Sequence, residues 1–135
     1  MMKREALKKC RAQWIWMMSA AEYADVKQED GAADQCLTLH KLKHQYFKSL
    51  DIAYANQPLS GCYLCEYSIV DGMPDCLTCP LKGYAWGQCE DITSPYVLFE
   101  EAIENEMYDQ AAEYAERIID ACDEALNDLE DDDEE

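Results

Sequence analysis

The stretch LKKCRAQWIWMMSAAEYA, residues 7–24, decides the fold class. Its apolar side chains recur three and four residues apart, at Leu7, Cys10, Trp14, Met17, Ala21 and Ala24. This spacing is the period of one helix face, so we expect an α-helix from residue 3 to about residue 29. Ile15, Trp16 and Met18 lie off that stripe and make the helix apolar nearly all round for about one and a half turns. Such a segment is typical of a central core helix or of a protein interface.

A second helix follows Gly31. Asp34 is a favourable N-cap, and Asn56 and Pro58 are expected to end the helix. Its apolar stripe consists of Leu39, Leu42, Tyr46, Leu50 and Ala53.

A third helix is predicted to begin at Ser94-Pro95, because Ser is a preferred N-cap and Pro is favoured at the first helical position. Its apolar stripe consists of Phe99, Ile103, Met107, Ala111, Tyr114, Ile118, Cys122, Leu126 and Leu129, with no Gly or Pro between them. A helix over residues 94–129 would be about 50 Å long. The sequence thus predicts a mainly α fold, a three-helix arrangement with a long acidic C-terminal helix, in a single domain over residues 1–129.

The charge of the chain is concentrated at one end. The formal net charge is −18, and residues 100–135 hold 17 of the 29 acidic residues but only one basic residue, Arg117. The first 11 residues are basic. This distribution argues against direct binding to nucleic-acid phosphates or to anionic membranes, both of which require Lys and Arg. The run over residues 130–135 is expected to be a disordered acidic tail.

The chain is expected to be a cytoplasmic protein without a membrane span. No run of about 18 apolar residues exists. The apolar run from Trp14 to Met18 is shorter than the roughly 7–15 residues of a signal-peptide core. In the cytoplasm thiols stay reduced, which favours metal binding over disulfides.

The chain has eight cysteines, and five of them cluster in a segment rich in Gly and Pro, residues 58–93, which reads as a module inserted between helices. The five are Cys62, Cys65, Cys76, Cys79 and Cys89. Two Cys-x-x-Cys pairs are typical of a tetrahedral zinc site, so we expect a structural zinc knuckle. Cys62 and Cys65 are the ligands that the spacing predicts most clearly, and the other two ligands come from the remaining three cysteines. An iron–sulfur cluster is the alternative cofactor.

This module resembles that of small cysteine-rich proteins common in bacteriophage and prophage genomes. The resemblance rests on Cys-x-x-Cys, Cys-x-x-Cys-Pro and Cys, followed by Ser94-Pro95-Tyr96, which opens a helix. It covers the module well and the flanking helices in outline. It implies a phage-type origin and a metal knuckle, in a family that is largely uncharacterised, and it implies no activity.

A stripe of carboxylates follows one side of the third helix. Its members, the acidic stripe, recur every three or four residues at Asp109, Glu113, Glu116, Asp120, Glu124 and Asp128. Their rise of about 5–6 Å per step is near the spacing of successive phosphates along a nucleic-acid strand. The stripe therefore predicts a nucleic-acid mimic that binds a basic host protein by charge complementarity.

No Ser-His-Asp order, phosphate loop or carboxylate pair stands out, so the predicted function is not enzymatic. We expect a non-enzymatic, zinc-stabilised phage-type protein that inhibits a nucleic-acid-binding defence factor, such as a restriction or CRISPR-type protein. One alternative is a structural or oligomerisation protein that forms a homodimer and uses its acidity for solubility. A second alternative is an iron–sulfur or redox-regulatory protein.

Overall fold

The computed structural model describes residues 3–29, 38–52, 63, 69–70, 73–74 and 94–132. Its helices are α1 (Lys3–Glu29), α2 (Leu39–Ser49), α4 (Pro95–Glu104) and α5 (Tyr108–Asp132), and its strands are β1 (Ile69–Val70) and β2 (Met73–Pro74). The described part of the chain is mainly helical, which confirms the mainly α character of the prediction but not its three-helix arrangement. All five clustered cysteines lie outside the described residues, as does the end of the chain after Asp132.

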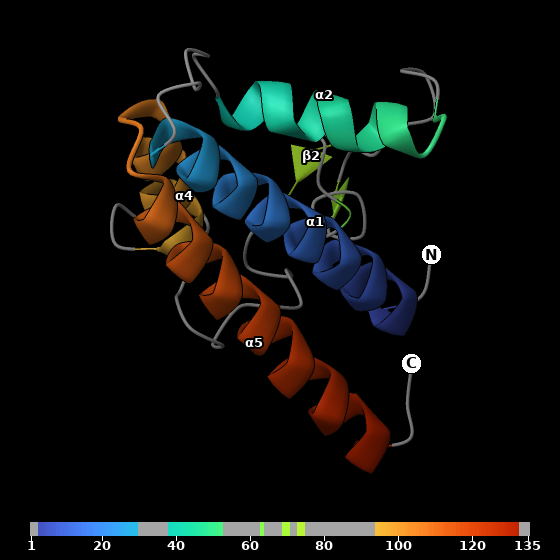
Figure 1. Cartoon of the computed structure of the whole chain (residues 1–135). Helices are drawn as coiled ribbons and strands as arrows, with labels where there is room; N and C mark the ends of the chain where they lie inside the picture. The colour runs from blue at the N-terminus through green and yellow to red at the C-terminus, as the bar shows by residue number, and fades with distance from the viewer. Residues whose placement is uncertain are drawn as a thin grey trace.

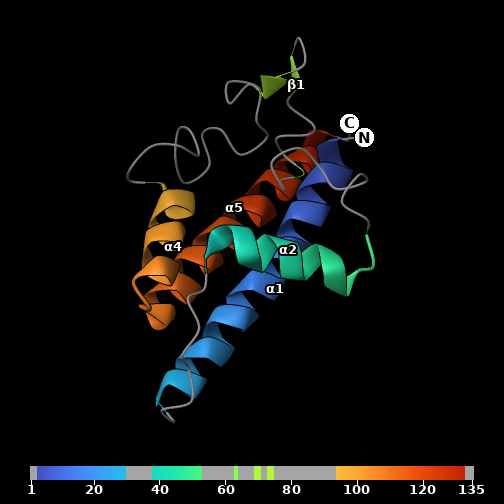
Figure 2. The ribbon, with the colours of Figure 1, turned by 90° about the horizontal axis from the view of Figure 1, so that it is seen from above.

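The helices stack around α1. In Figure 1, α1 and α5 run side by side in opposite directions, so the first residues of α1 lie near the last residues of α5. Helix α2 crosses the other side of α1, as Figure 2 shows from above. Helix α4 packs beside α5. No helix of the described part combines the length and apolarity needed to cross a bilayer.

The predicted stripe of α1 forms the core. All six of its residues are buried, the least so being Ala24 with 7% of its surface exposed. Trp14 packs edge-on against Phe99 of α4, with ring centroids 4.9 Å apart. Trp16, which lies off the stripe, contacts Tyr46 of α2 at 5.6 Å between ring centroids. The all-round apolarity of α1 is therefore explained by neighbours on two sides, which makes α1 the central helix.

The third predicted helix is two helices. The start is as predicted, since the Ser94 hydroxyl accepts a hydrogen bond from the Val97 amide at 3.2 Å and Pro95 occupies the first turn. The helix ends at Glu104, however, and α5 starts at Tyr108. Glu106 has a φ of 60° between them.

Two backbone hydrogen bonds close this break. The Met107 amide bonds the Ala102 carbonyl at 2.8 Å, and the Glu106 amide bonds the Ile103 carbonyl at 3.2 Å. This is the Schellman motif that ends many helices, normally with Gly at the left-handed position. Met107, predicted to be buried in a continuous stripe, is 42% exposed because it follows the motif. The break lets α4 fold back along α5 and bury Phe99 and Ile103, which are fully covered.

Helix α2 is shorter than predicted at its C-terminal end. Its N-cap is Thr38, whose hydroxyl accepts from the Lys41 amide at 3.1 Å, whereas the predicted cap, Asp34, lies outside the described residues. The helix ends at Ser49 in a second Schellman motif, with Asp51 at a φ of 59°. Leu50, predicted on the buried stripe, is the C-cap and is 49% exposed.

Two small elements of the 58–93 segment are described. Strands β1 and β2 pair antiparallel, with Ile69 opposite Pro74 and Val70 opposite Met73. Tyr63, which lies between Cys62 and Cys65 in the sequence, is buried against Phe47 of α2 with 5.9 Å between ring centroids.

Candidate functional site

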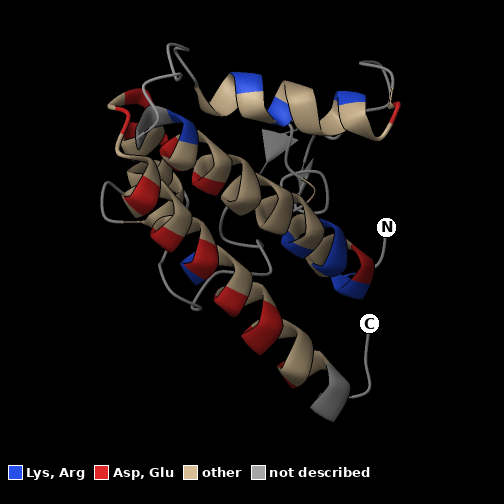
Figure 3. Cartoon of the chain, in the orientation of Figure 1, with Lys and Arg blue, Asp and Glu red and all other residues tan. Residues whose placement is uncertain are grey.

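The acidic stripe is entirely on the surface of α5. All six of its residues are exposed, and red segments, which mark Asp and Glu, recur along most of the described length of α5 in Figure 3. The opposite face of α5 is apolar and buried, mainly against α1. Its most deeply covered residues are Ala111, Ala115, Ile118, Ala121, Cys122 and Ala125. The apolar period that buries one face of α5 thus fixes the stripe on the solvent side.

Basic side chains near α5 do not neutralise the middle of the stripe. Arg117, the only basic residue of α5, lies over the Tyr114 ring at 5.3 Å from its centroid. Arg11 of α1 forms an ion pair with Asp123, which is not part of the stripe, at 2.5 Å. Four stripe residues make no ion pair with any residue that the structure describes: Glu113, Glu116, Asp120 and Glu124.

This charge arrangement works against the stability of α5 as an isolated helix. Like charges four residues apart each cost about 0.2–0.5 kcal/mol. Acidic residues at the C-terminal end also oppose the helix macrodipole. The helix is held instead by its buried apolar face, where each large side chain contributes roughly 1.5–3 kcal/mol. The fold therefore maintains a dense row of carboxylates that local interactions disfavour.

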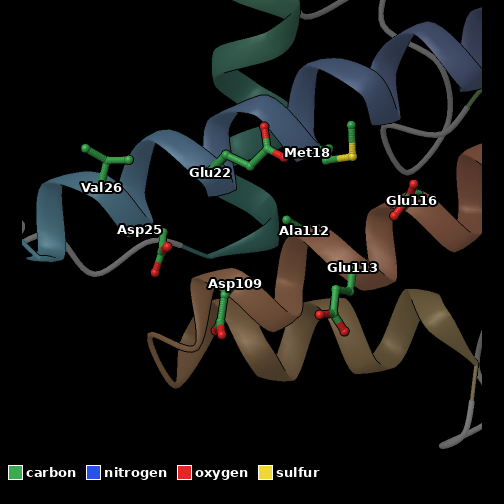
Figure 4. Close-up of a pocket in the computed structure, with 8 residues that line it drawn as sticks. All are labelled: Met18, Glu22, Asp25, Val26, Asp109, Ala112, Glu113 and Glu116. Carbon is green, nitrogen blue, oxygen red and sulfur yellow. The ribbon is translucent and has the colours of Figure 1, made fainter.

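Helix α1 extends this acidic surface. A groove of about 410 Å³ runs between α1 and the first turns of α5. Figure 4 shows its lining: Glu22 and Asp25 from α1, Asp109, Glu113 and Glu116 from α5, and the apolar Met18, Val26 and Ala112. Val26 is 55% exposed. No signal in the sequence marks Glu22 and Asp25 as part of this site, because only the packing of α1 on α5 brings them beside the stripe.

The groove is suited to a basic side chain. Carboxylates accept hydrogen bonds from Lys and Arg, and the apolar residues of the groove suit the aliphatic stem that carries such a head group. Within the described residues no three His, Cys, Asp or Glu side chains are arranged to hold a metal ion.

The predicted metal ligands cannot be placed. Cys62, Cys65, Cys76, Cys79 and Cys89 all lie outside the described residues. Cys10 and Cys122, which lie on the predicted apolar stripes, are buried in the core between α1 and α5.

Of the residues that carry the resemblance to phage proteins, Ser94, Pro95 and Tyr96 are described, and they open α4. No protein-family model matches the chain, and no match was found among curated proteins or among solved structures.

Proposed function

We propose that this protein is a non-enzymatic binding protein of phage type that uses the acidic stripe of α5 to occupy the nucleic-acid groove of a basic host protein. The partner class is a nucleic-acid-binding defence factor of the host cytoplasm, such as a restriction or CRISPR-type protein. Occupation of its groove inhibits the partner, because nucleic acid and the stripe compete for the same Lys and Arg side chains.

The observation that carries this proposal is the exposure of the stripe together with the unpaired state, among the described residues, of its four middle carboxylates. Glu113, Glu116, Asp120 and Glu124 are exposed and make no ion pair within the described part of the chain. A surface that serves solubility alone works best with both signs of charge interspersed. From Asp109 to Asp128 the stripe extends about 28 Å, which is long enough to contact several basic side chains of a groove.

The groove between α1 and α5 supports the same proposal. It adds Glu22 and Asp25 to one end of the stripe and offers apolar contacts at Met18 and Val26. The aliphatic stem of a partner Lys or Arg bound there would be removed from water, while its charged head group pairs with the carboxylates. The end of the stripe near Asp109 is therefore where the tightest contact is expected.

The test is binding of a purified basic, DNA-binding defence nuclease, measured with and without a duplex DNA competitor at 0.05, 0.15 and 0.5 M NaCl. We expect affinity to fall steeply with salt and DNA to compete, because both effects follow from charge contacts with a nucleic-acid groove. The double change Glu116→Lys and Asp120→Lys should weaken binding at least about tenfold.

The matched control is Glu101→Lys with Glu104→Lys. These residues are exposed on α4, and the pair changes the net charge by the same amount without touching the stripe. Equal loss of affinity in the two double variants, or binding that is insensitive to salt, contradicts the proposal.

We also propose that Cys62 and Cys65, with two of Cys76, Cys79 and Cys89, hold a structural zinc ion. Two described features support this. The antiparallel pairing of Ile69 with Pro74 brings the two ends of the hairpin together. In the sequence, Cys65 precedes the first of these ends by four residues and Cys76 follows the second by two. Tyr63, which follows Cys62 in the sequence, packs against Phe47 of α2.

Elemental analysis should find one zinc per chain in a colourless protein. Cys62→Ser with Cys65→Ser should abolish metal binding and lower the thermal midpoint, because metal binding energy is folding energy. Cys122→Ser is the matched control, since Cys122 is buried in α5 and is not among the proposed ligands, so this variant should retain the metal. A coloured protein containing iron and sulfide would establish the iron–sulfur alternative instead.

A further inference from the structure

A second groove lies on the opposite side of α1 from the acidic stripe, between α1 and α2. Its volume is about 630 Å³, within the range of about 300–1,000 Å³ usual for small-molecule sites. It opens beside the basic start of α1, which is visible as the cluster of Lys and Arg near the N-terminus in Figure 3. Three kinds of side chain line it: cationic, phenolic and aliphatic.

The cationic wall comes from the first turns of α1. Arg4, Lys8 and Lys9 line the groove together with one acidic residue, Glu5. Glu5 pairs with Lys9 at 3.3 Å. Lys8 is exposed and forms no ion pair with any residue that the structure describes. The wall therefore has an excess of positive charge in a strongly acidic protein.

The phenolic wall consists of Tyr46 and Tyr63, which are 7% and 8% exposed. Neither hydroxyl has a hydrogen-bond partner within the described part of the chain. Burial is the main cause that raises the pKa of both phenols above the usual range, so both keep their protons at neutral pH. Buried hydroxyl groups are normally hydrogen-bonded, and a protonated phenol can donate to an anionic oxygen.

The aliphatic part is formed by Leu50 and Ile52, which follow the end of α2. Leu50 is 49% exposed and is one of few large apolar side chains at the described surface. A ligand body resting on these residues would remove apolar surface from water, which favours binding.

We propose that this groove binds a small organic anion with an apolar body. Lys8 and the two phenol hydroxyls hold the acidic head group, and the aromatic or aliphatic body lies against Leu50 and Ile52. The acidic stripe does not line this groove. The site is separate from the acidic stripe and does not depend on the function proposed for it.

The test uses two dyes that differ only in charge. 8-Anilinonaphthalene-1-sulfonate is an aromatic anion whose fluorescence rises in apolar surroundings, and N-phenyl-1-naphthylamine has the same rings without the sulfonate. Titration of the full chain at 0.15 M NaCl should give one saturable site for the sulfonate. The uncharged dye should bind at least about tenfold more weakly, because it lacks the charge-assisted hydrogen bonds.

Two matched pairs of variants locate the site. Lys8→Glu should weaken sulfonate binding at least about tenfold, whereas Lys48→Glu, an exposed position of α2 that does not line the groove, should leave it within about twofold. Leu50→Ser should weaken binding about threefold or more, whereas Val26→Ser, a similarly exposed residue near the other end of α1, should not.

Tyr46→Phe tests the hydroxyl without removing the ring. We expect sulfonate affinity to fall about fivefold while the thermal midpoint stays constant or rises, because the hydroxyl has no described partner to lose. Equal affinity for the two dyes, or equal effects of Lys8→Glu and Lys48→Glu, would overturn the proposal. A lowered thermal midpoint of Tyr46→Phe with unchanged dye affinity would also overturn it, since the hydroxyl would then be structural.

Discussion

Asp51 and Glu106 have the same unusual backbone conformation. Each is the left-handed residue of a Schellman motif, with φ of 59° and 60°. For a residue with a Cβ this conformation costs roughly 1–2 kcal/mol, whereas glycine adopts it without strain. The ends of α2 and α4 are thus determined by hydrogen bonding and packing rather than by the preference of the residue at the turn.

Replacing the strained residue should therefore stabilise the protein. We expect Glu106→Gly to raise the free energy of unfolding by about 1 kcal/mol, measured by urea denaturation. Glu101→Gly is the control, because Glu101 is an exposed position inside α4, where glycine should cost about 0.5–1 kcal/mol. Loss of stability in both variants would show that Glu106 is not held in a strained conformation.

Individual residues also show which helix boundaries the sequence can predict and which it cannot. Ser94-Pro95 marks the start of α4, because cap chemistry is local and both residues are the preferred types. No comparable signal marks Glu106 or Asp51, since the usual sign of a left-handed helix end is glycine. Thr38 likewise caps α2 although Asp34 is an equally good cap in the sequence.

At the scale of elements, the break between α4 and α5 replaces one long helix by a helical pair. The apolar period continues through residues 94–129, so the sequence pattern alone favours a single helix. Met107, the stripe residue at the break, is nevertheless 42% exposed, while Phe99 is fully buried against Trp14. Folding back is favoured because it covers the apolar face of α4, which a straight helix would extend past the end of α1.

This arrangement predicts unequal effects for two residues of the same predicted stripe. Phe99→Ala should cost about 3–5 kcal/mol, because it removes a fully buried ring. Met107→Ala should change stability by less than about 0.5 kcal/mol, because the side chain is exposed. Denaturant unfolding of both variants measures the difference, and similar costs would favour the continuous helix.

The candidate sites show the same contrast between residues of one helix, which the sequence can predict, and residues brought together by packing, which it cannot. The acidic stripe could be predicted, because one helix contains all of it and the buried period of α5 fixes its exposure. The residues that complete the two grooves could not. Glu22 reaches the stripe only through the packing of α1 on α5, and Lys8 meets Tyr46 and Leu50 only through the crossing of α1 and α2.

At the scale of the whole molecule, the antiparallel packing of α1 and α5 brings charges of opposite sign together at one end of the core. The basic start of α1 lies near the acidic end of α5, and Arg11 with Asp123 is the described ion pair between them. Both side chains of that pair are nearly half exposed, so its contribution is small, typically below about 1 kcal/mol. Repulsion among the acidic residues from 100 onward is the larger electrostatic effect.

Salt should therefore stabilise the protein. We expect the thermal midpoint to rise by roughly 5 °C between 0.02 and 0.5 M NaCl, because screening weakens the repulsion within this strongly acidic chain more than it weakens exposed ion pairs. The Glu116→Lys, Asp120→Lys variant should show a smaller rise, as it carries less repulsion along α5. A midpoint that falls with salt would mean that attractive pairs dominate.

The pairing of α1 with α5 also has a consequence for synthesis of the chain. The two helices that share the main core are separated by the 78 residues between Glu29 and Tyr108. At about 5–20 residues per second, the ribosome takes on the order of 4–16 s to make that segment. During this time the apolar face of α1, including Trp14 and Met17, has no α5 to cover it, so this part of the core can form only after α5 has been synthesised.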